Sequence, residues 1–163
     1  MKAHRLTLVS VLAAMLVGST GTVALSQEAS APAQAPSLYQ RLGGVYSIAT
    51  VVDDLIERLL VNDVLNANSA IAEARQRVPK AGLKYHLTSM VCWATGGPEA
   101  YTGRSMKDSH AHLNITEEEW QVFLADFKTT LDKFKVPEAE QKELFAIVES
   151  TKADIVVGTE KKQ

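Results

Sequence analysis

Apolar residues recur at intervals of three and four between positions 46 and 61, which is the spacing of an α-helix with one buried face. The charged residues of this stretch, at positions 53, 54, 57 and 58, fall on the opposite face. Similar spacing returns at 83–95, at 117–134 and in the segment between Pro137 and Ile155. No stretch alternates apolar and polar residues with the period of two that predicts a strand. We therefore expect an all-α fold.

Two capping boxes mark helix starts. Ser37 and Gln40 have the spacing of a box that opens a short helix, which the Gly43-Gly44 pair then ends. Thr116 and Glu119 form a second box, at the start of the helix that runs to about position 134.

The remaining helix boundaries follow from glycine, proline and composition. Gly96-Gly97-Pro98 ends the helix at 83–95, and a short helix is expected at 106–113. Pro137 is expected at the first position of the last helix. The segment 62–79 is rich in asparagine, alanine and charge, so we expect a loop there with one or two helical turns near 70–77.

The N-terminus has the pattern of a secretory signal peptide over residues 1–26. Lys2 and Arg5 precede an apolar run and a stretch of small residues, with cleavage expected before Gln27. The run is shorter than the ~20 residues that span a bilayer, although an uncleaved membrane anchor is the alternative. We expect an exported protein, periplasmic or secreted, with no stable membrane span after signal removal.

The rest of the chain divides into three parts. Residues 27–36 lack aromatic and branched apolar side chains, which predicts a disordered spacer. Residues 37–157 have the size of one domain with a single core, and 158–163 form a flexible tail.

Charge and cysteine content argue against three features: a nucleic acid partner, an internal disulfide and covalent haem attachment of the c type. Removing residues 1–26 takes Lys2 and Arg5 and lowers the formal charge from −2 to −4, so no nucleic acid partner is expected. Cys92 is the single cysteine, which excludes an internal disulfide and the Cys-x-x-Cys-His attachment of a c-type haem. We expect Cys92 to be a small packed residue.

Candidate metal ligands are few, because the chain beyond residue 26 has only His86, His110 and His112. His110 and His112 are two residues apart, so on a helix they point to different sides and do not hold one ion together. A lone histidine near a helix end is usually solvated, so the residues alone leave the role of His110 open.

Three blocks of residues resemble the group 1 truncated haemoglobins, and together they span nearly the whole domain. These blocks are Leu38-Tyr39-x-x-Leu42-Gly43-Gly44, Val51-Val52-Asp53-Asp54, and a long block that runs from Gly96 to Thr116 and includes Met106-Lys107-x-x-His110. The resemblance implies two antiparallel helix pairs around the haem, a two-over-two helical sandwich. It implies haem b as cofactor and His110 as the proximal ligand of its iron, since neutral imidazole is the usual globin ligand.

The distal side departs from the family pattern. Ile56 stands where the family usually places a ligand-binding tyrosine, and Leu87 stands where a glutamine is common. With Leu83 and Met90, these residues would line a pocket without a hydrogen-bond donor, so tight retention of oxygen is not expected. Asn66-Ala67-Asn68-Ser69 also replaces the family's phenylalanine-rich packing, which indicates a remodelled pocket.

His86 matches a position at which some cyanobacterial members carry a second iron-binding histidine. It lies off the apolar stripe of its helix, so a distal ligand and a surface residue are equally compatible with the sequence. Arg104 is the first candidate to pair with a haem propionate, and Met106 is expected in the haem pocket.

The expected function is binding of haem and, through its iron, of a small diatomic ligand such as dioxygen or nitric oxide. Ligation by both His86 and His110 would favour electron transfer, with an unnamed redox partner, or gated ligand binding. Catalysis is not expected beyond a nitric oxide dioxygenase or peroxidase-like side activity. The alternatives are a helical binding or structural domain that has lost haem, and a haem carrier.

Overall fold

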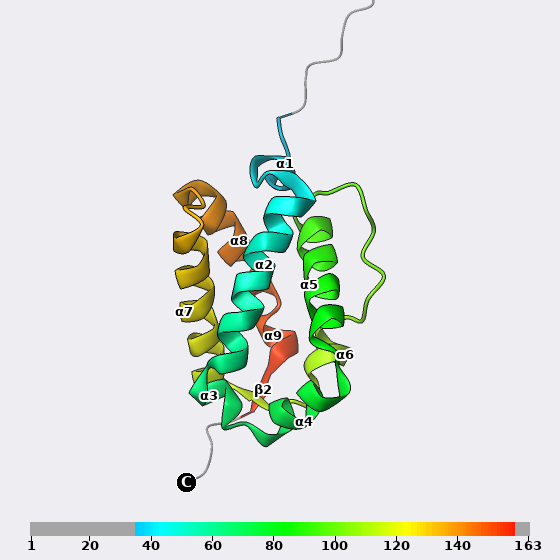
Figure 1. Cartoon of the computed structure of the whole chain (residues 1–163), viewed down its shortest axis with the longest axis vertical. Coiled ribbons are helices and arrows are strands. Elements are labelled where there is room, and N and C mark those ends of the chain that lie inside the picture. Colours follow the sequence, from blue (N-terminus) through cyan, green and yellow to red (C-terminus); the bar gives the residue numbers. More distant parts are fainter. Residues whose placement is uncertain (1–34, 159–163) are drawn as a thin grey trace, which may run out of the picture. The chain divides into compact units, whose positions relative to one another are not determined.

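Two antiparallel helix pairs form the fold, as Figure 1 shows for the computed structural model, which describes residues 35–158. In the first pair, α2 (Gly44–Val61) lies beside α5 (Lys80–Ala94). In the second pair, α7 (Glu117–Lys133) returns into α8 (Glu138–Ser150). The expected two-over-two helical fold is confirmed. The shorter elements are α1 (Leu38–Arg41), α3 (Asp63–Asn66), α4 (Ser69–Arg77), α6 (Met106–His110), α9 (Lys152–Ile155), β1 (Ile115–Thr116) and β2 (Val156–Gly158).

Helix α2 is buried on two faces. Leu55 joins a cluster with residues of α7 and α8, in which the rings of Phe127 and Phe145 lie 5.1 Å apart. Ile48, Val52 and Ile56 join a second cluster with Cys92 of α5. Burying both faces removes a large apolar area from water, so α2 links the two helix pairs.

The segment 62–79 contains more helix than expected. The helical turns expected near 70–77 are confirmed by α4, whereas α3 was expected to be loop. Asn62 and Asn68 explain both helices, because each side-chain oxygen accepts hydrogen bonds from the backbone amides two and three residues further along the chain. The asparagines of the segment 62–79 therefore indicate helix N-caps and not only a loop.

Two short strands are the clearest departure from the expected absence of strands. β1 pairs in parallel with β2, with Ile115 opposite Val156 and Thr116 opposite Gly158. Strands of two and three residues are too short to show an alternating pattern in the sequence. The second strand of the pair comes from the far end of the domain.

The capping boxes of Ser37 and Thr116 are both confirmed. The last helix differs from the expectation, because Pro137 is the N-cap of α8 and α8 ends at Ser150. Thr151 interrupts the helix by donating from its hydroxyl group to the Val148 carbonyl oxygen, at 2.7 Å, and α9 follows. Helix α6 ends at His110, three residues earlier than expected.

The expected signal peptide lies outside the described residues, as do positions 27–34 of the spacer and 159–163 of the tail. Ala35 and Pro36, the last spacer residues, are exposed and belong to no regular element. Among the helices within 35–158, none combines the length and the apolar character needed to cross a membrane.

The turn after α5 depends on Gly96 and Gly97. Gly96 adopts a φ of 83°, in the left-handed region that glycine tolerates best. Gly97 donates its amide to the Cys92 carbonyl at 2.7 Å, and a Cβ at this position would lie 2.6 Å from that same oxygen. The turn thereby brings the chain back against α1, where Tyr39 donates its amide to the Thr95 carbonyl.

We expect Gly97→Ala to lower the free energy of unfolding by about 2 kcal/mol, because its Cβ would force the backbone apart. Gly82→Ala is the matched control, since a Cβ there meets no atom within 4 Å. On helix propensity it should raise the free energy of unfolding by about 0.5–1 kcal/mol. Urea unfolding followed by circular dichroism measures both changes. Equal stability of the two variants would contradict this account of the turn.

Candidate functional site

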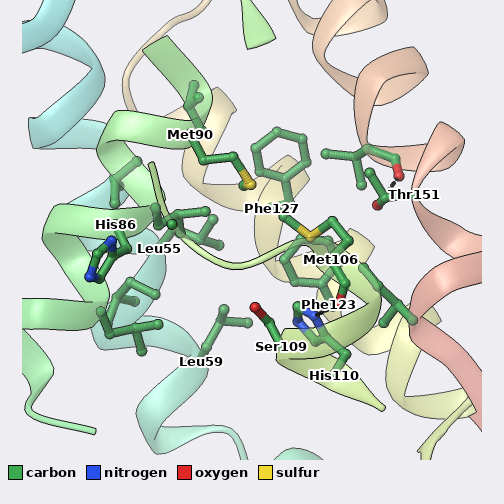
Figure 2. A pocket seen from close by; sticks show the side chains of 18 of the residues that line it. Leu55, Leu59, His86, Met90, Met106, Ser109, His110, Phe123, Phe127 and Thr151 are labelled. Atoms are coloured by element: carbon green, nitrogen blue, oxygen red, sulfur yellow. Dashed lines mark hydrogen bonds between the residues drawn. The ribbon is translucent and has the colours of Figure 1, made fainter. Parts of the chain in front are cut away.

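A cavity of about 1570 Å³ lies between the two helix pairs. It is larger than the roughly 300–1,000 Å³ typical of small-molecule pockets. Helices α2, α5, α6 and α7 provide most of its wall, and Figure 2 shows side chains from several of them converging on it. The segment Asn66-Ala67-Asn68-Ser69, which was also expected at the pocket, does not line this cavity. Eight residues that the sequence assigned to the haem pocket or its iron do line it: Ile56, Leu83, His86, Leu87, Met90, Arg104, Met106 and His110.

His110 presents one ring nitrogen to a hydrogen bond within α6. Its Nδ1 lies 2.9 Å from the carbonyl oxygen of Met106, one helical turn earlier. A carbonyl only accepts hydrogen bonds, so Nδ1 carries the proton and Nε2 keeps a free lone pair. Burial lowers the pKa of His110, and the nearby His112 lowers it further. The ring is therefore neutral at pH 7, with Nε2 available as a ligand.

Local sequence sets the position of α6. Ser105 is its N-cap, accepting from the Asp108 amide at 3.0 Å and donating to the Asp108 carboxylate at 2.7 Å. This closed pair of hydrogen bonds fixes the first turn of a helix of only five residues. His110 lies at the end of that turn, beside Ser109, which also lines the cavity (Figure 2).

Ile56, Leu87 and Met90 form an apolar part of the wall that α2 and α5 contribute. Ile56 is 4% exposed and packs in the cluster of Val52 and Cys92. Leu87 is half-buried against the same cluster, and Met90 is half-buried with its side chain drawn toward the cavity in Figure 2. These three side chains carry no N–H or O–H group. A small molecule beside them would meet no hydrogen-bond donor from these three side chains.

His86 lies on α5, on the side of the cavity away from His110 (Figure 2). Its side chain is exposed, and its ring meets that of Tyr85 edge to face with the ring centroids 5.3 Å apart. The structure thus brings both histidines to one cavity but leaves His86 at the outer edge of the wall.

The edge of the cavity carries positive charge. Among the described lining residues, Arg75, Arg77, Lys80 and Arg104 are basic, whereas Glu119 is the only carboxylate. Glu119 is 1% exposed and accepts from the Thr116 amide and hydroxyl group, at 2.8 and 3.1 Å, as part of a capping box. Lys80 is paired with Glu57 and Arg75 donates to carbonyl oxygens of α2, so Arg77 and Arg104 are the cations best placed to favour a ligand with anionic groups.

Several lining residues were not predicted as part of the site. Phe123 and Phe127 of α7 have nearly parallel rings with centroids 6.0 Å apart, and both line the cavity. Their four-residue spacing was recognised as a buried helix face, but periodicity does not distinguish a packed core from a cavity wall. Arg77 and Thr151 gave no signal, because their position depends on how distant elements meet.

The cavity fits a haem on three physical grounds. It is large and mostly apolar, as a porphyrin face requires. His110 offers a neutral imidazole with a free Nε2, the usual protein ligand of globin iron. The basic edge, including Arg77 and Arg104, offers partners for propionates.

Comparison with known proteins agrees with this arrangement. The bacterial-like globin family model matches residues 37–157. The Group 1 truncated hemoglobin GlbN of Synechocystis sp. (strain PCC 6803) is 30% identical over 107 residues, covering 63% of this chain and 81% of the relative. The Group 1 truncated hemoglobin GlbN of Mycolicibacterium paratuberculosis is 25% identical over 126 residues, covering 77% and 88%.

Solved structures show the same fold. The truncated haemoglobin of Tetrahymena pyriformis, in its Fe(III) form, superposes with a TM-score of 0.65 and 19% identity, covering 76% of this chain and 100% of that chain. The 2/2 haemoglobin of Synechococcus sp. PCC 7002, in the cyanomet state and with covalently attached haem, gives a TM-score of 0.65 and 22% identity, covering 74% and 98%.

Fold, site and comparisons define a globin, the haem-binding class of helical proteins. The chain belongs to the bacterial-like globin family, and its relatives place it among the group 1 truncated haemoglobins.

Burial of His110 makes the stability of the haem-free protein depend on pH. The pKa of His110 is lowered in the folded chain, so below the ordinary value of about 6.5 the unfolded chain binds more protons. Stability should therefore fall as pH drops from about 7.5 to about 5.5. In His110→Leu this loss should be smaller, as urea unfolding at the two pH values would measure. An identical loss of stability in His110→Leu would show that His110 is not the source of the pH dependence.

Proposed function

We propose that this globin binds haem b in the cavity, with Nε2 of His110 as the proximal ligand of the iron. The observation that carries the proposal is the hydrogen bond from His110 Nδ1 to the Met106 carbonyl, at 2.9 Å. This bond leaves the lone pair of Nε2 available to bind iron. When bound, haem supplies an iron with a further position for a diatomic ligand such as dioxygen or nitric oxide.

The residues of this chain would shape the ligand position on the iron, opposite His110, mainly by excluding water. Ile56, Leu87 and Met90 line the cavity with apolar groups and give a bound ligand no hydrogen bond. A ligand held without such a bond leaves sooner. Rapid release argues against oxygen storage, and the expected export leaves sensing, nitric oxide detoxification and electron transfer as candidate roles. A nitric oxide dioxygenase or peroxidase-like reaction would be a side activity that needs an electron donor.

His86 is the candidate sixth ligand. It lines the same cavity from α5, but it is exposed, so it would have to turn inward to meet the iron. An exogenous ligand would then have to displace it, which makes binding gated by a conformational equilibrium. Six-coordinate iron would favour a redox or electron-transfer role.

The location that we propose for this activity is outside the cytoplasm, periplasmic or secreted. The N-terminal pattern of Lys2, Arg5 and a short apolar run supports export.

A haem carrier on the same scaffold is the second candidate. The expected export and the polar segment Asn66-Ala67-Asn68-Ser69 fit this role. A helical binding or structural domain that has lost haem is the third candidate. If this candidate is correct, the purified chain should stay colourless when haem is supplied. The rate of haem transfer to an apoglobin acceptor separates a carrier, which releases haem quickly, from a globin that retains it.

The first experiment is a haem titration of the purified protein followed by visible spectra in the ferric and ferrous states. His110→Gly should lose the wild-type spectrum and regain it with added imidazole, because the free base fills the space that the side chain leaves. A low-spin spectrum that His86→Ala converts to high-spin would establish six-coordination. If wild type gives no haem spectrum, the proposal is wrong and only the scaffold is shared.

The lack of a distal donor gives a second test. Leu87→Gln adds an amide N–H to the wall and should slow dioxygen dissociation from the reduced protein by about five- to tenfold, as one hydrogen bond is worth roughly 1 kcal/mol or slightly more. Stopped-flow kinetics measure the rate. Met90→Leu, which exchanges one apolar lining residue for another, is the control and should leave the rate nearly unchanged. An unaltered rate in Leu87→Gln would show that a ligand is not held beside this wall.

A further inference from the structure

Residues 69–86, which comprise α4 and the first half of α5, cover one side of the cavity without a buried side chain of their own. Helix α4 contains no buried residue, and the single buried residue of α5 is Cys92, in its second half. Val78 and Leu83 are 46% and 37% exposed. Ile71 is half-buried against the cluster of Ile115, Trp120 and Ile155, but little other apolar burial holds this segment in place, which is typical of regions that open locally.

Both ends of the segment are firmly anchored. At one end, Asn68 is buried, caps α4 and donates from its side-chain amide to the Leu113 carbonyl at 2.9 Å. At the other end, Leu87, Val91 and Cys92 pack against the apolar face of α2. The part between these anchors is the part free to move.

Charged contacts with α2 hold the middle of the segment. Lys84 forms an ion pair with Asp53, at 2.5 Å, and another with Glu57, and Lys80 pairs with Glu57 at 2.9 Å. Two carboxylates one turn apart on α2 thus face two lysines one turn apart on α5. Lys84 lies two residues before His86 on the same helix, so a movement of this part of α5 away from α2 would carry His86 with it.

Arg75 provides a further contact near the end of α2. Its guanidinium group donates to the carbonyl oxygens of Leu59 and Leu60, at 2.9 and 3.4 Å, and to the side chain of Asn66. The last carbonyls of a helix have no partner within the helix and carry partial negative charge, so a cation is stabilised there. The segment carries four basic residues and one acidic residue, which matches the acidic face of α2.

We propose that residues 69–86 are a lid over the cavity, closed by the charged contacts of Arg75, Lys80 and Lys84 with α2 and opened when those contacts are weakened. Ile71, Val78, Leu83 and His86 line the cavity from this lid, so its opening widens the entrance and moves His86 together with it. The part of the proposal that concerns haem entry and His86 ligation rests on the proposed function. The movement of the lid itself does not.

Hydrogen exchange on the whole chain without added haem tests the movement. Lys84→Met removes two ion pairs and should speed exchange of the amides at 80–86 by about fivefold, while amides of α7 keep their rates. Asp53→Asn, a conservative change at an exposed partner, should act in the same direction. Lys128→Met is the matched control, because Lys128 pairs with Asp132 on the exposed side of α7 and with no other carboxylate among residues 35–158. Unchanged lid exchange in both Lys84→Met and Asp53→Asn would overturn the proposal.

The dependence of hydrogen exchange on salt concentration is an independent test of the lid. Raising sodium chloride from about 10 mM to about 1 M shortens the Debye length from about 30 Å to about 3 Å. Exchange of the lid amides in wild type should then rise about threefold, and Lys84→Met should respond less. Equal salt responses in the two proteins would contradict an ionic closure.

Haem uptake separates the lid from the proposed function. Lys84→Met should take up hemin about threefold faster than wild type and than Lys128→Met, in stopped-flow measurements. Faster lid exchange with no hemin binding in any of these proteins would uphold the lid and overturn the haem function. Hemin binding with identical uptake rates and identical lid exchange would uphold the haem function and overturn the lid.

Discussion

Burial of α2 on two faces is the packing constraint on which the rest of the structure depends. Leu55 faces α7 and α8, and Val52 and Ile56 face α5, so one helix is shared by both pairs. The space left where the pairs diverge is the cavity. Since α2 supplies residues to the core and to the cavity wall, a change that moves it alters the site and the stability of the chain together.

Much of the fold could be predicted because the long helices carry their own signals. The period of α2, the capping boxes at Ser37 and Thr116 and the glycines at 96 and 97 are local features, and the structure has each of them. The strands could not be predicted, because Ile115 and Val156 are far apart in the chain and their pairing is tertiary. The helix α3 was missed because its asparagine cap resembles loop composition.

The site shows the same division between local and tertiary information. His110 was singled out by its motif, whereas its free Nε2 depends on a hydrogen bond to Met106 that only three-dimensional structure reveals. Leu87 and His86 of α5 were identified by their match to family positions, but that match could not show that His86 is exposed or that Lys84 is paired with α2. Roles that depend on contacts between helices are therefore absent from the sequence pattern.

Cys92 is 4% exposed within the α2 and α5 cluster, and burial raises the pKa of its thiol. Thiolate is the form that oxidises and exchanges with disulfides, so this side chain reacts slowly as long as α5 stays packed on α2. The chain has no second cysteine with which to close a loop. In an oxidising compartment the folded protein would consequently remain unlinked to other chains, and formation of a covalent dimer would report that the helix pair had come apart.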